Sequence, residues 1–393
     1  MRAIVVAAIG CFAMRVAHAD PKQLHAAAQA ADTGHCSPAT CTPEIVALYQ
    51  QAADAYAAYL AKSPDDAEAR FLRAQILDMK LGRLEEAGDE YARVGALQVV
   101  GKYHEDALLG AIDAYDRARG TGPSASPIDD KLVAAANRYV ELFHGGPHMT
   151  EIMFRLGQLA FDRGRLADAA RIFQTIVTRF PNDPNAGPAG DRWLSVLDRA
   201  RDWAGIERAA AVLRTLPAFQ APDRLELLAH LALQAIAKQA EAAADGGHAR
   251  DAAAQYRRAF AAATSDDDRV RYLYLAATML ARARAYGDAR AAYVELATTY
   301  PRTSKAAEAL FAAARVDEAR FDWDGAASSY EQLARSYPRD ERAADALYDA
   351  GVLRRALDQR DAAIAAFGEL AARYAARRDA ESAALVRAEL VGT

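Results

Sequence analysis

The sequence predicts an all-α protein built as an array of stacked helical hairpins. One phrase occurs twice in nearly the same form, as AAYVELATTYPRTSKAAEALFAAA at 291–314 and as SSYEQLARSYPRDERAADALYDAG at 328–351. Both copies are rich in alanine and carry apolar residues three and four apart, a pattern that favours helix. A unit that recurs at a fixed step of this length is typical of a solenoid, in which each repeat packs only against its neighbours.

The second helix of each hairpin is defined by ladders of residues 37 positions apart. The first ladder consists of small residues, Ala252, Ala289, Ala326 and Ala363. Four residues later comes an aromatic ladder, Tyr256, Tyr293, Tyr330 and Phe367, and three residues after that a mostly aliphatic one, Ala259, Leu296, Leu333 and Leu370. Spacings of four and three place the three side chains on one helical face. Pro301 and Pro338 follow two of these helices and end them.

The first helix of each hairpin precedes that ladder, at 271–283, 305–319 and 341–356. Between the two helices stand the short breaks AYGD, FDWD and DQRD. Each break contains an acidic residue, which we expect to cap the helix that follows.

The clearest single repeat is 153–181, and it resembles the tetratricopeptide repeat. Seven of its residues fall on that family's positions: Leu156, Gly157, Gly164, Ala169, Phe173, Ile176 and Pro181. Further units fit around Ala52, Tyr56 and Pro64; Gly82, Ala87 and Tyr91; and Ala135, Tyr139, Leu142 and Pro147; with a weak one through Trp193, Trp203 and Leu213. The resemblance implies a right-handed solenoid of about eight helical hairpins. Its C-terminal step of 37 residues exceeds the family's usual length of about 34.

About the last 125 residues carry a longer phrase, Y-P-x-x-x-x-A-x-x-A-L-aromatic. It is similar to the repeats of exported bacterial envelope proteins: the outer-membrane assembly lipoproteins and the periplasmic proteins associated with Tol-Pal. The similarity implies a role in envelope assembly, wall remodelling or a trans-envelope machine, and does not choose among them.

The first nineteen residues read as an export signal, with Arg2, the apolar run 3–14 and the cleavage motif Ala17-His18-Ala19. We therefore expect a periplasmic protein of a Gram-negative bacterium, with outer-membrane association as an option. Lipidation of Cys11 is the alternative. After the signal, no apolar stretch is long enough to span a membrane.

Two cysteines remain in the mature chain, Cys36 and Cys41, within HCSPATCTP. In an oxidising compartment this pair predicts a local disulfide. A zinc site that recruits His35 would lack a fourth ligand. The expected domains are 20–181, which begins at this staple, and 182–393, which holds the 37-residue repeats and ends in a capping helix. The stretch PNDPNAGPAGD separates them.

No catalytic, cofactor or metal constellation stands out. The histidines 144 and 148 flank glycines and a proline that forbid a helix, and the acids 266–268 fit the start of a helix better than a calcium loop. The net charge of −5 is small and both signs are interspersed, which excludes a nucleic-acid footprint. The chain is therefore expected to be non-enzymatic.

What remains is surface. In the family that the chain resembles, first helices line the concave side, and the position after their first consensus apolar residue faces inward. The aromatic residues there are Phe154, Tyr274, Phe311 and Tyr348, with Gln158, Thr278, Arg315 and Arg355 nearby. One hypothesis is a peptide or partner groove; the other is that the rings pack against the neighbouring hairpin.

Two functions are therefore open. The first is an envelope scaffold that binds other envelope proteins or peptides. The second is an array associated with peptidoglycan or another glycan. Self-association is a third option for a solenoid, unless the C-terminal helix at 375–393 caps it.

Overall fold

The computed structural model describes residues 20–120, 126–376 and 378–392, and only the backbone of residues 378 and 379. The predicted signal peptide, residues 1–19 with Cys11, lies outside the described residues. Within them all regular structure is helical, as nineteen α-helices and the short 3-10 helix η1 (Pro217–Phe219). The predicted all-α class is confirmed.

The contacts between residues divide the chain into two compact units, which separate between Ala200 and Arg201. The helices of the first unit are α2 (Pro21–Ala31), α3 (Pro43–Leu60), α4 (Ala67–Met79), α5 (Leu84–Gly95), α6 (His104–Ala118), α7 (Pro127–Leu142), α8 (Met149–Asp162), α9 (Leu166–Arg179) and α10 (Ala186–Arg199). Those of the second unit are α11 (Trp203–Leu213), α12 (Pro222–Asp245), α13 (Ala249–Ala262), α14 (Asp266–Arg282), α15 (Tyr286–Thr299), α16 (Ser304–Ala319), α17 (Trp323–Ser336), α18 (Ala343–Ala356), α19 (Arg360–Arg373) and α20 (Arg378–Gly392).

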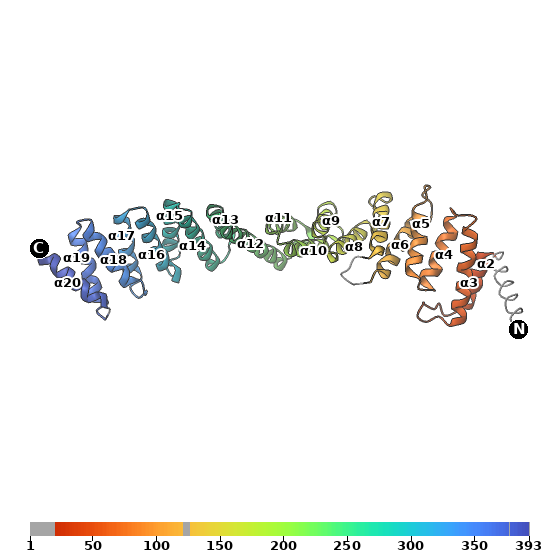
Figure 1. The fold of residues 1–393 in the computed structure, drawn as a ribbon, viewed down its shortest axis with the longest axis horizontal. Helices are drawn as coiled ribbons and strands as arrows, with labels where there is room; N and C mark the ends of the chain where they lie inside the picture. Colours follow the sequence, from red (N-terminus) through yellow and green to blue (C-terminus); the bar gives the residue numbers. More distant parts are fainter. Residues whose placement is uncertain (1–19, 121–125, 377, 393) are drawn as a thin grey trace. The chain divides into compact units, whose positions relative to one another are not determined.

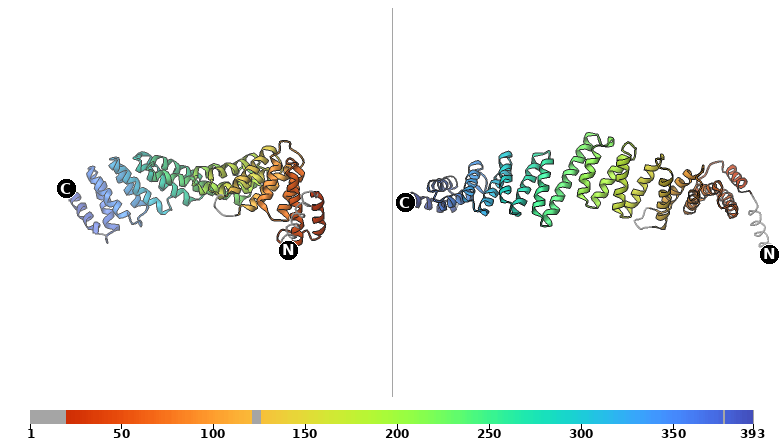
Figure 2. Two further views of the ribbon diagram at one scale, coloured as in Figure 1. Left: turned by 45° about the vertical axis from the view of Figure 1, so that its right-hand side comes forward. Right: turned by 90° about the horizontal axis from the view of Figure 1, so that it is seen from above.

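Within each unit, successive helices lie side by side as hairpins (Figures 1 and 2). Four pairs stack in the first unit, from α2/α3 to α8/α9, and four in the second, from α12/α13 to α18/α19. The described helices thus form the expected eight hairpins. The domain boundary expected at 181/182 stays a prediction. The compact units divide later because α10 packs against α9. Residues 180–185 form the turn between these helices, and the rest of the Pro- and Gly-rich stretch, 186–191, begins α10.

The repeat ladders form the core of the second unit. The four ladder alanines are completely buried, as are Leu296, Leu333 and Leu370. The aromatic ladder from Tyr256 to Phe367 is at most 5% exposed. A side chain as small as alanine lets neighbouring helices approach closely, and the larger rings fill the remaining space. The 37-residue period of the sequence therefore corresponds to buried core positions that recur once per hairpin.

The helix starts agree only in part with the caps expected from the sequence. In FDWD, Asp322 caps α17 by accepting the backbone N–H of Gly325 at 3.0 Å. In AYGD and DQRD the capping residue is Ala285 or Gln359, without a side-chain bond, and the acid lies in the first turn. Capping was therefore the wrong role for these two acids, which instead complement the helix dipole.

The turns inside the hairpins share one backbone feature, a residue with positive φ. Glycine has positive φ in four of them, at Gly82, Gly120, Gly164 and Gly247. In the turn before α17 the residue is Phe321, with φ of 64°, and its side chain is 77% exposed. A β-carbon is strained in this conformation, whereas glycine is not. Phe321 therefore stands where the fold favours glycine.

Consecutive hairpins of the second unit are tied together by tyrosines at the ends of second helices. The Tyr337 hydroxyl donates to the carbonyl of Pro301 at 2.9 Å, and Tyr374 donates to that of Pro338 at 2.7 Å. Tyr300 holds the same position one repeat earlier, but the matching residue upstream is Thr264 rather than proline. Within the described residues its hydroxyl makes no hydrogen bond.

We expect Phe321→Gly to be more stable than Phe321→Ala by about 1 kcal/mol, because only glycine relieves the positive-φ strain. Both variants remove the same exposed ring, so their difference isolates the backbone. Urea unfolding followed by circular dichroism measures it. Equal stability of the two variants would show that this turn is unstrained.

We expect Tyr337→Phe to lower the free energy of unfolding by about 1 kcal/mol, the usual net value of one hydrogen bond. Tyr300→Phe is the matched control and should be neutral, since its hydroxyl has no partner among the described residues. The same unfolding measurement serves, and similar losses in both variants would contradict the tether.

Candidate partner-binding surface

The four aromatic residues predicted for the groove pack first of all inside their own hairpins. Each ring contacts the consensus ring of the second helix. Centroid separations are 5.4 Å for Phe154–Phe173, 5.6 Å for Tyr274–Tyr293, 5.4 Å for Phe311–Tyr330 and 6.1 Å for Tyr348–Phe367. The planes are inclined by 58–68°, the edge-to-face range that aromatic quadrupoles favour. The packing partner is thus the same hairpin, whereas the sequence suggested the neighbouring one.

This packing leaves part of each ring at the surface. Tyr348 is 36% exposed, and Phe154, Tyr274 and Phe311 are half-buried. A ring that is fixed along one edge and open along another has little conformational freedom to lose when it binds. The four rings, called the first-helix rings below, remain the predicted contact residues.

The polar residues predicted beside these rings mostly bond within their own helices. Gln158 donates to Asp162 at 2.7 Å, and Arg315 lies 3.2 Å from Glu318. Thr278 donates to the backbone oxygen of its ring neighbour, Tyr274, at 2.9 Å. Arg355 is exposed on α18.

A carboxylate of the α16/α17 hairpin binds the first-helix ring of the adjacent hairpin α14/α15. The Tyr274 hydroxyl donates to Glu308 Oε1 at 2.6 Å, and the Lys305 ammonium lies 4.6 Å above the Tyr274 ring. Burial raises the pKa of Tyr274, and the bond to Glu308 adds to the rise. Burial also acts to raise the pKa of Glu308, but the bonds from Lys305 and Tyr274 outweigh it and lower that pKa.

A second set of carboxylates surrounds Tyr330, the ring that contacts Phe311. The Tyr330 hydroxyl donates to Glu318 Oε1 at 3.1 Å. Burial raises the pKa of Tyr330, and the charges of Glu318 and Asp349 raise it further. The carboxyl of Asp349 on α18 also has a raised pKa, first from burial and then from Glu318 and Asp345.

Sequence reasoning missed these carboxylates but left a signal for the ring pairs. Each first-helix ring precedes its partner by 19 residues, as in 311 and 330. That constant offset would have predicted the packing. Glu308 and Asp349 have no such signal, because their role depends on how one hairpin registers against the next.

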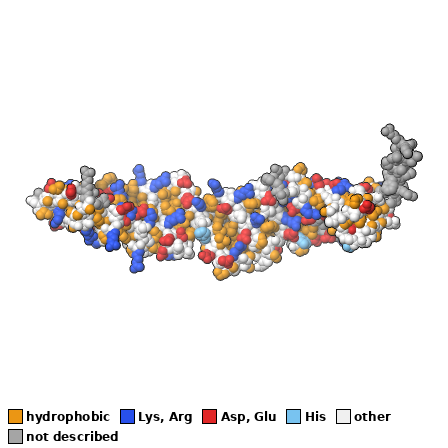
Figure 3. Space-filling view, turned by 90° about the horizontal axis from the view of Figure 1, so that it is seen from below, with side chains coloured by type: hydrophobic (Ala, Val, Ile, Leu, Met, Phe, Trp, Pro, Cys, Tyr) orange, Lys and Arg blue, Asp and Glu red, His pale blue; other side chains and the backbone are white. Residues whose placement is uncertain are grey.

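The wider surface has mixed charge. On the face drawn in Figure 3, lysine, arginine and acidic side chains are interspersed over both units. Within the described residues, no helix is long and apolar enough to cross a membrane. The same residues contain no group of three or more His, Cys, Asp or Glu side chains placed to hold a metal ion.

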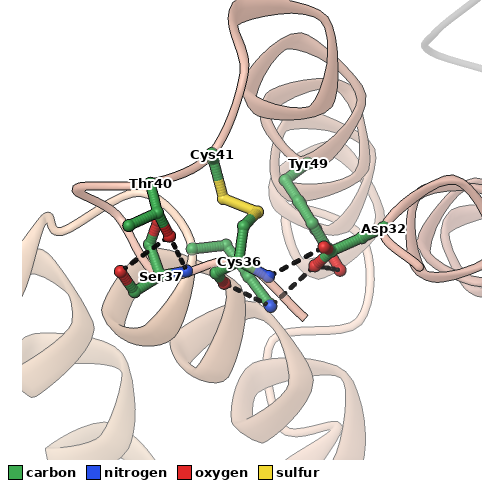
Figure 4. Close-up of a disulfide and its surroundings, with 7 residues drawn as sticks. Asp32, Cys36, Ser37, Thr40, Cys41 and Tyr49 are labelled. Carbon is green, nitrogen blue, oxygen red and sulfur yellow. Dashed lines mark hydrogen bonds and ion pairs between the residues drawn. A yellow bond between two sulfur atoms is a disulfide. The ribbon is translucent and has the colours of Figure 1, made fainter. Parts of the chain in front are cut away.

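The predicted disulfide is present between Cys36 and Cys41, whose Cα atoms lie 4.9 Å apart (Figure 4). Asp32, at the end of α2, organises this loop. Its carboxylate accepts the Cys36 N–H at 2.8 Å, the Tyr49 hydroxyl at 3.0 Å and the Lys80 ammonium at 2.8 Å. Lys80 also donates to the Cys36 carbonyl at 2.7 Å. The loop is thereby attached to α3 and α4.

These donors hold the pKa of Asp32 at about 2, against an ordinary 3.8. The bond from Lys80 contributes most, followed by the Cys36 N–H. A carboxylate in this position needs no metal or ligand to compensate its charge. The disulfide loop is therefore a structural staple.

The described helices, paired as hairpins with small and aromatic residues at fixed positions, define a helical repeat protein. A family model for the tetratricopeptide repeat matches residues 48–97 and 132–184. A second tetratricopeptide-repeat model matches residues 308–340 and 345–376. Both compact units of the chain therefore contain tetratricopeptide repeats, and arrays of such repeats in general are protein-binding scaffolds. The matching families include no catalytic domain.

Solved structures give only a distant likeness. The tetratricopeptide-repeat domain of P58(IPK) is 17% identical, with 85% of this chain and 92% of that chain covered and a TM-score of 0.27. The Naa15/Naa10 complex bound to HypK-THB is 16% identical, with 85% of this chain and 62% of that chain covered and a TM-score of 0.25. The C-terminal part of a tetratricopeptide-repeat-containing protein from Cytophaga hutchinsonii is 14% identical, with 80% of this chain and 98% of that chain covered and a TM-score of 0.27. No curated protein matched the sequence. These scores add nothing to the family assignment.

We expect Asp32→Asn to lower the melting temperature at pH 7 and to have little effect near pH 2. A depressed pKa means that the ionised carboxylate stabilises the fold above pH 4, and this stabilisation is lost as the pH falls toward 2. Scanning calorimetry across this range tests it. Asp65→Asn, an exposed change without a hydrogen bond to lose among the described residues, is the control. An unchanged melting temperature at pH 7 would contradict the stabilising role of Asp32 in the disulfide loop.

Proposed function

We propose that this protein is a non-enzymatic scaffold of the bacterial cell envelope, which binds partner proteins through its first-helix rings. The observation that carries the proposal is their repetition: four hairpins present a half-open aromatic ring at one position of the first helix. Aromatic side chains held rigidly at a surface are the usual anchors of protein interfaces.

The envelope location rests on two supports. The first nineteen residues have the composition of an export signal. The disulfide between Cys36 and Cys41 is of the kind that persists in oxidising compartments and is rare in reducing ones. Together they favour the periplasm, with its neighbouring membrane surfaces, as the place where partners are met.

Rings at a fixed repeat position also indicate the form of the bound segment. Three successive first helices of the second unit, α14, α16 and α18, each offer one anchor, so a partner that follows this part of the array meets an aromatic contact once per hairpin. An extended or helical segment with regularly spaced apolar side chains fits such a row.

A benzophenone amino acid placed at Phe311 or Tyr348 in living cells tests the proposal. We expect ultraviolet crosslinking to capture one envelope protein at these positions. The matched control is Ala291, which is exposed on the second helix α15 of the same unit and should not capture it.

Two results would contradict the proposal. Crosslinks confined to this protein's own peptides would show that the first-helix rings only pack within the protein or between its copies. Crosslinks only to cytoplasmic proteins would remove the envelope assignment and leave a scaffold in another compartment. Mass spectrometry of the crosslinked peptides distinguishes these outcomes.

A further inference from the structure

The surface between α16 and α18 combines aromatic rings with an excess of negative charge. Glu318 on α16 and the residues Asp345 and Asp349 on α18 act on one another electrostatically around Tyr330. Arg315 is a cation near them, 3.2 Å from Glu318. The carboxylates of Glu318 and Asp349 thus lie close enough to act on each other and on Tyr330, and the charge of Arg315 partly offsets theirs.

Asp349 is the least satisfied member of this group. It is only half-exposed, and within the described residues it makes no hydrogen bond or ion pair. Burial and the two neighbouring carboxylates all disfavour its charged form, as its raised pKa records. Elsewhere in the unit, a buried carboxylate such as Asp317 has its own arginine, since Arg290 donates to it at 2.8 Å.

One first-helix ring is connected to this group of residues: Phe311 packs against Tyr330, whose hydroxyl is bound to Glu318. Tyr348 is next to Asp349 in the chain and is 36% exposed. Carboxylates together with aromatic faces are complementary to a lysine or arginine side chain, through ion pairing and cation–π attraction.

Resting on the proposed function, we infer that the partner segment is basic, and that one of its lysine or arginine side chains binds between Tyr348, Asp349 and Glu318. Apolar side chains that flank it contact the first-helix rings. Arg315 acts as an internal competitor that occupies part of the same negative surface when the partner is absent.

Fluorescence anisotropy with a fluorescein-labelled ten-residue peptide of alternating lysine and leucine tests this inference. Asp349→Asn and Tyr348→Ala should each weaken binding about tenfold, the effect of losing one charge-assisted contact. Arg315→Ala should strengthen binding. Higher salt should weaken it by screening. The matched control, Asp251→Asn on the second helix α13, removes an exposed carboxylate elsewhere and should leave affinity unchanged.

Folding does not confound the test. The raised pKa of Asp349 means that its ionised form destabilises the fold above its ordinary pKa of 3.8, so Asp349→Asn should fold at least as well as the parent. A thermal melt of each variant verifies this.

Any of three results would overturn the inference: no binding of the lysine peptide, equal affinity of all variants, or equal binding of a glutamate–leucine peptide. None of them touches the proposed function, which stands if crosslinking at Phe311 or Tyr348 still captures an envelope protein.

Discussion

The four hairpins that carry the first-helix rings depend on one contact, in which the aromatic ring of the second helix lies against a very small residue of the first. A β-carbon added at Gly351 would come within 2.6 Å of the Phe367 ring, and one at Gly157 within 2.8 Å of Phe173. Ala277 and Ala314 hold the equivalent positions opposite Tyr293 and Tyr330, fully buried. The contact fixes how closely the two helices approach, and through this distance it fixes where the first-helix ring meets its partner.

The first-helix rings consequently serve both the core and the surface. Their inner edges complete the aromatic pair of the hairpin, and their outer edges remain at the surface. A proposed binding residue that also packs cannot change freely, because its replacement would disturb the hairpin that presents it. The polar residues around it carry no such constraint, and specificity is more easily altered through them.

The repeating part of the fold was predictable from sequence because the period of residues is the period of contacts. The alanine ladder, the helix pairs and the local disulfide are all set within one repeat, where spacing alone determines which side chains meet. The carboxylates around Tyr330 were not predictable, since Glu318 and Asp349 belong to different hairpins and meet only through their stacking. Nor was the division after Ala200, since the proline- and glycine-rich stretch 181–191 looks like a boundary, whereas it holds a short turn and the start of α10. Asp32 and Lys80 lie 48 residues apart, beyond any local pattern.

The missing bond at Tyr300 has a mechanical consequence for the second unit. Two clusters of buried residues in this unit meet at α14, one formed by α12, α13 and α14 and one that extends from α14 to α20. The tyrosine ties at Pro301 and Pro338 all lie on the α20 side of this division. The joint between the α12/α13 and α14/α15 hairpins has no such tyrosine tie among the described residues, and an ion pair between Arg257 on α13 and Glu295 on α15, at 2.8 Å, links these hairpins instead. Because salt screens an exposed ion pair, the mechanical coupling at this joint would depend on ionic strength more than the coupling through the tyrosine ties does.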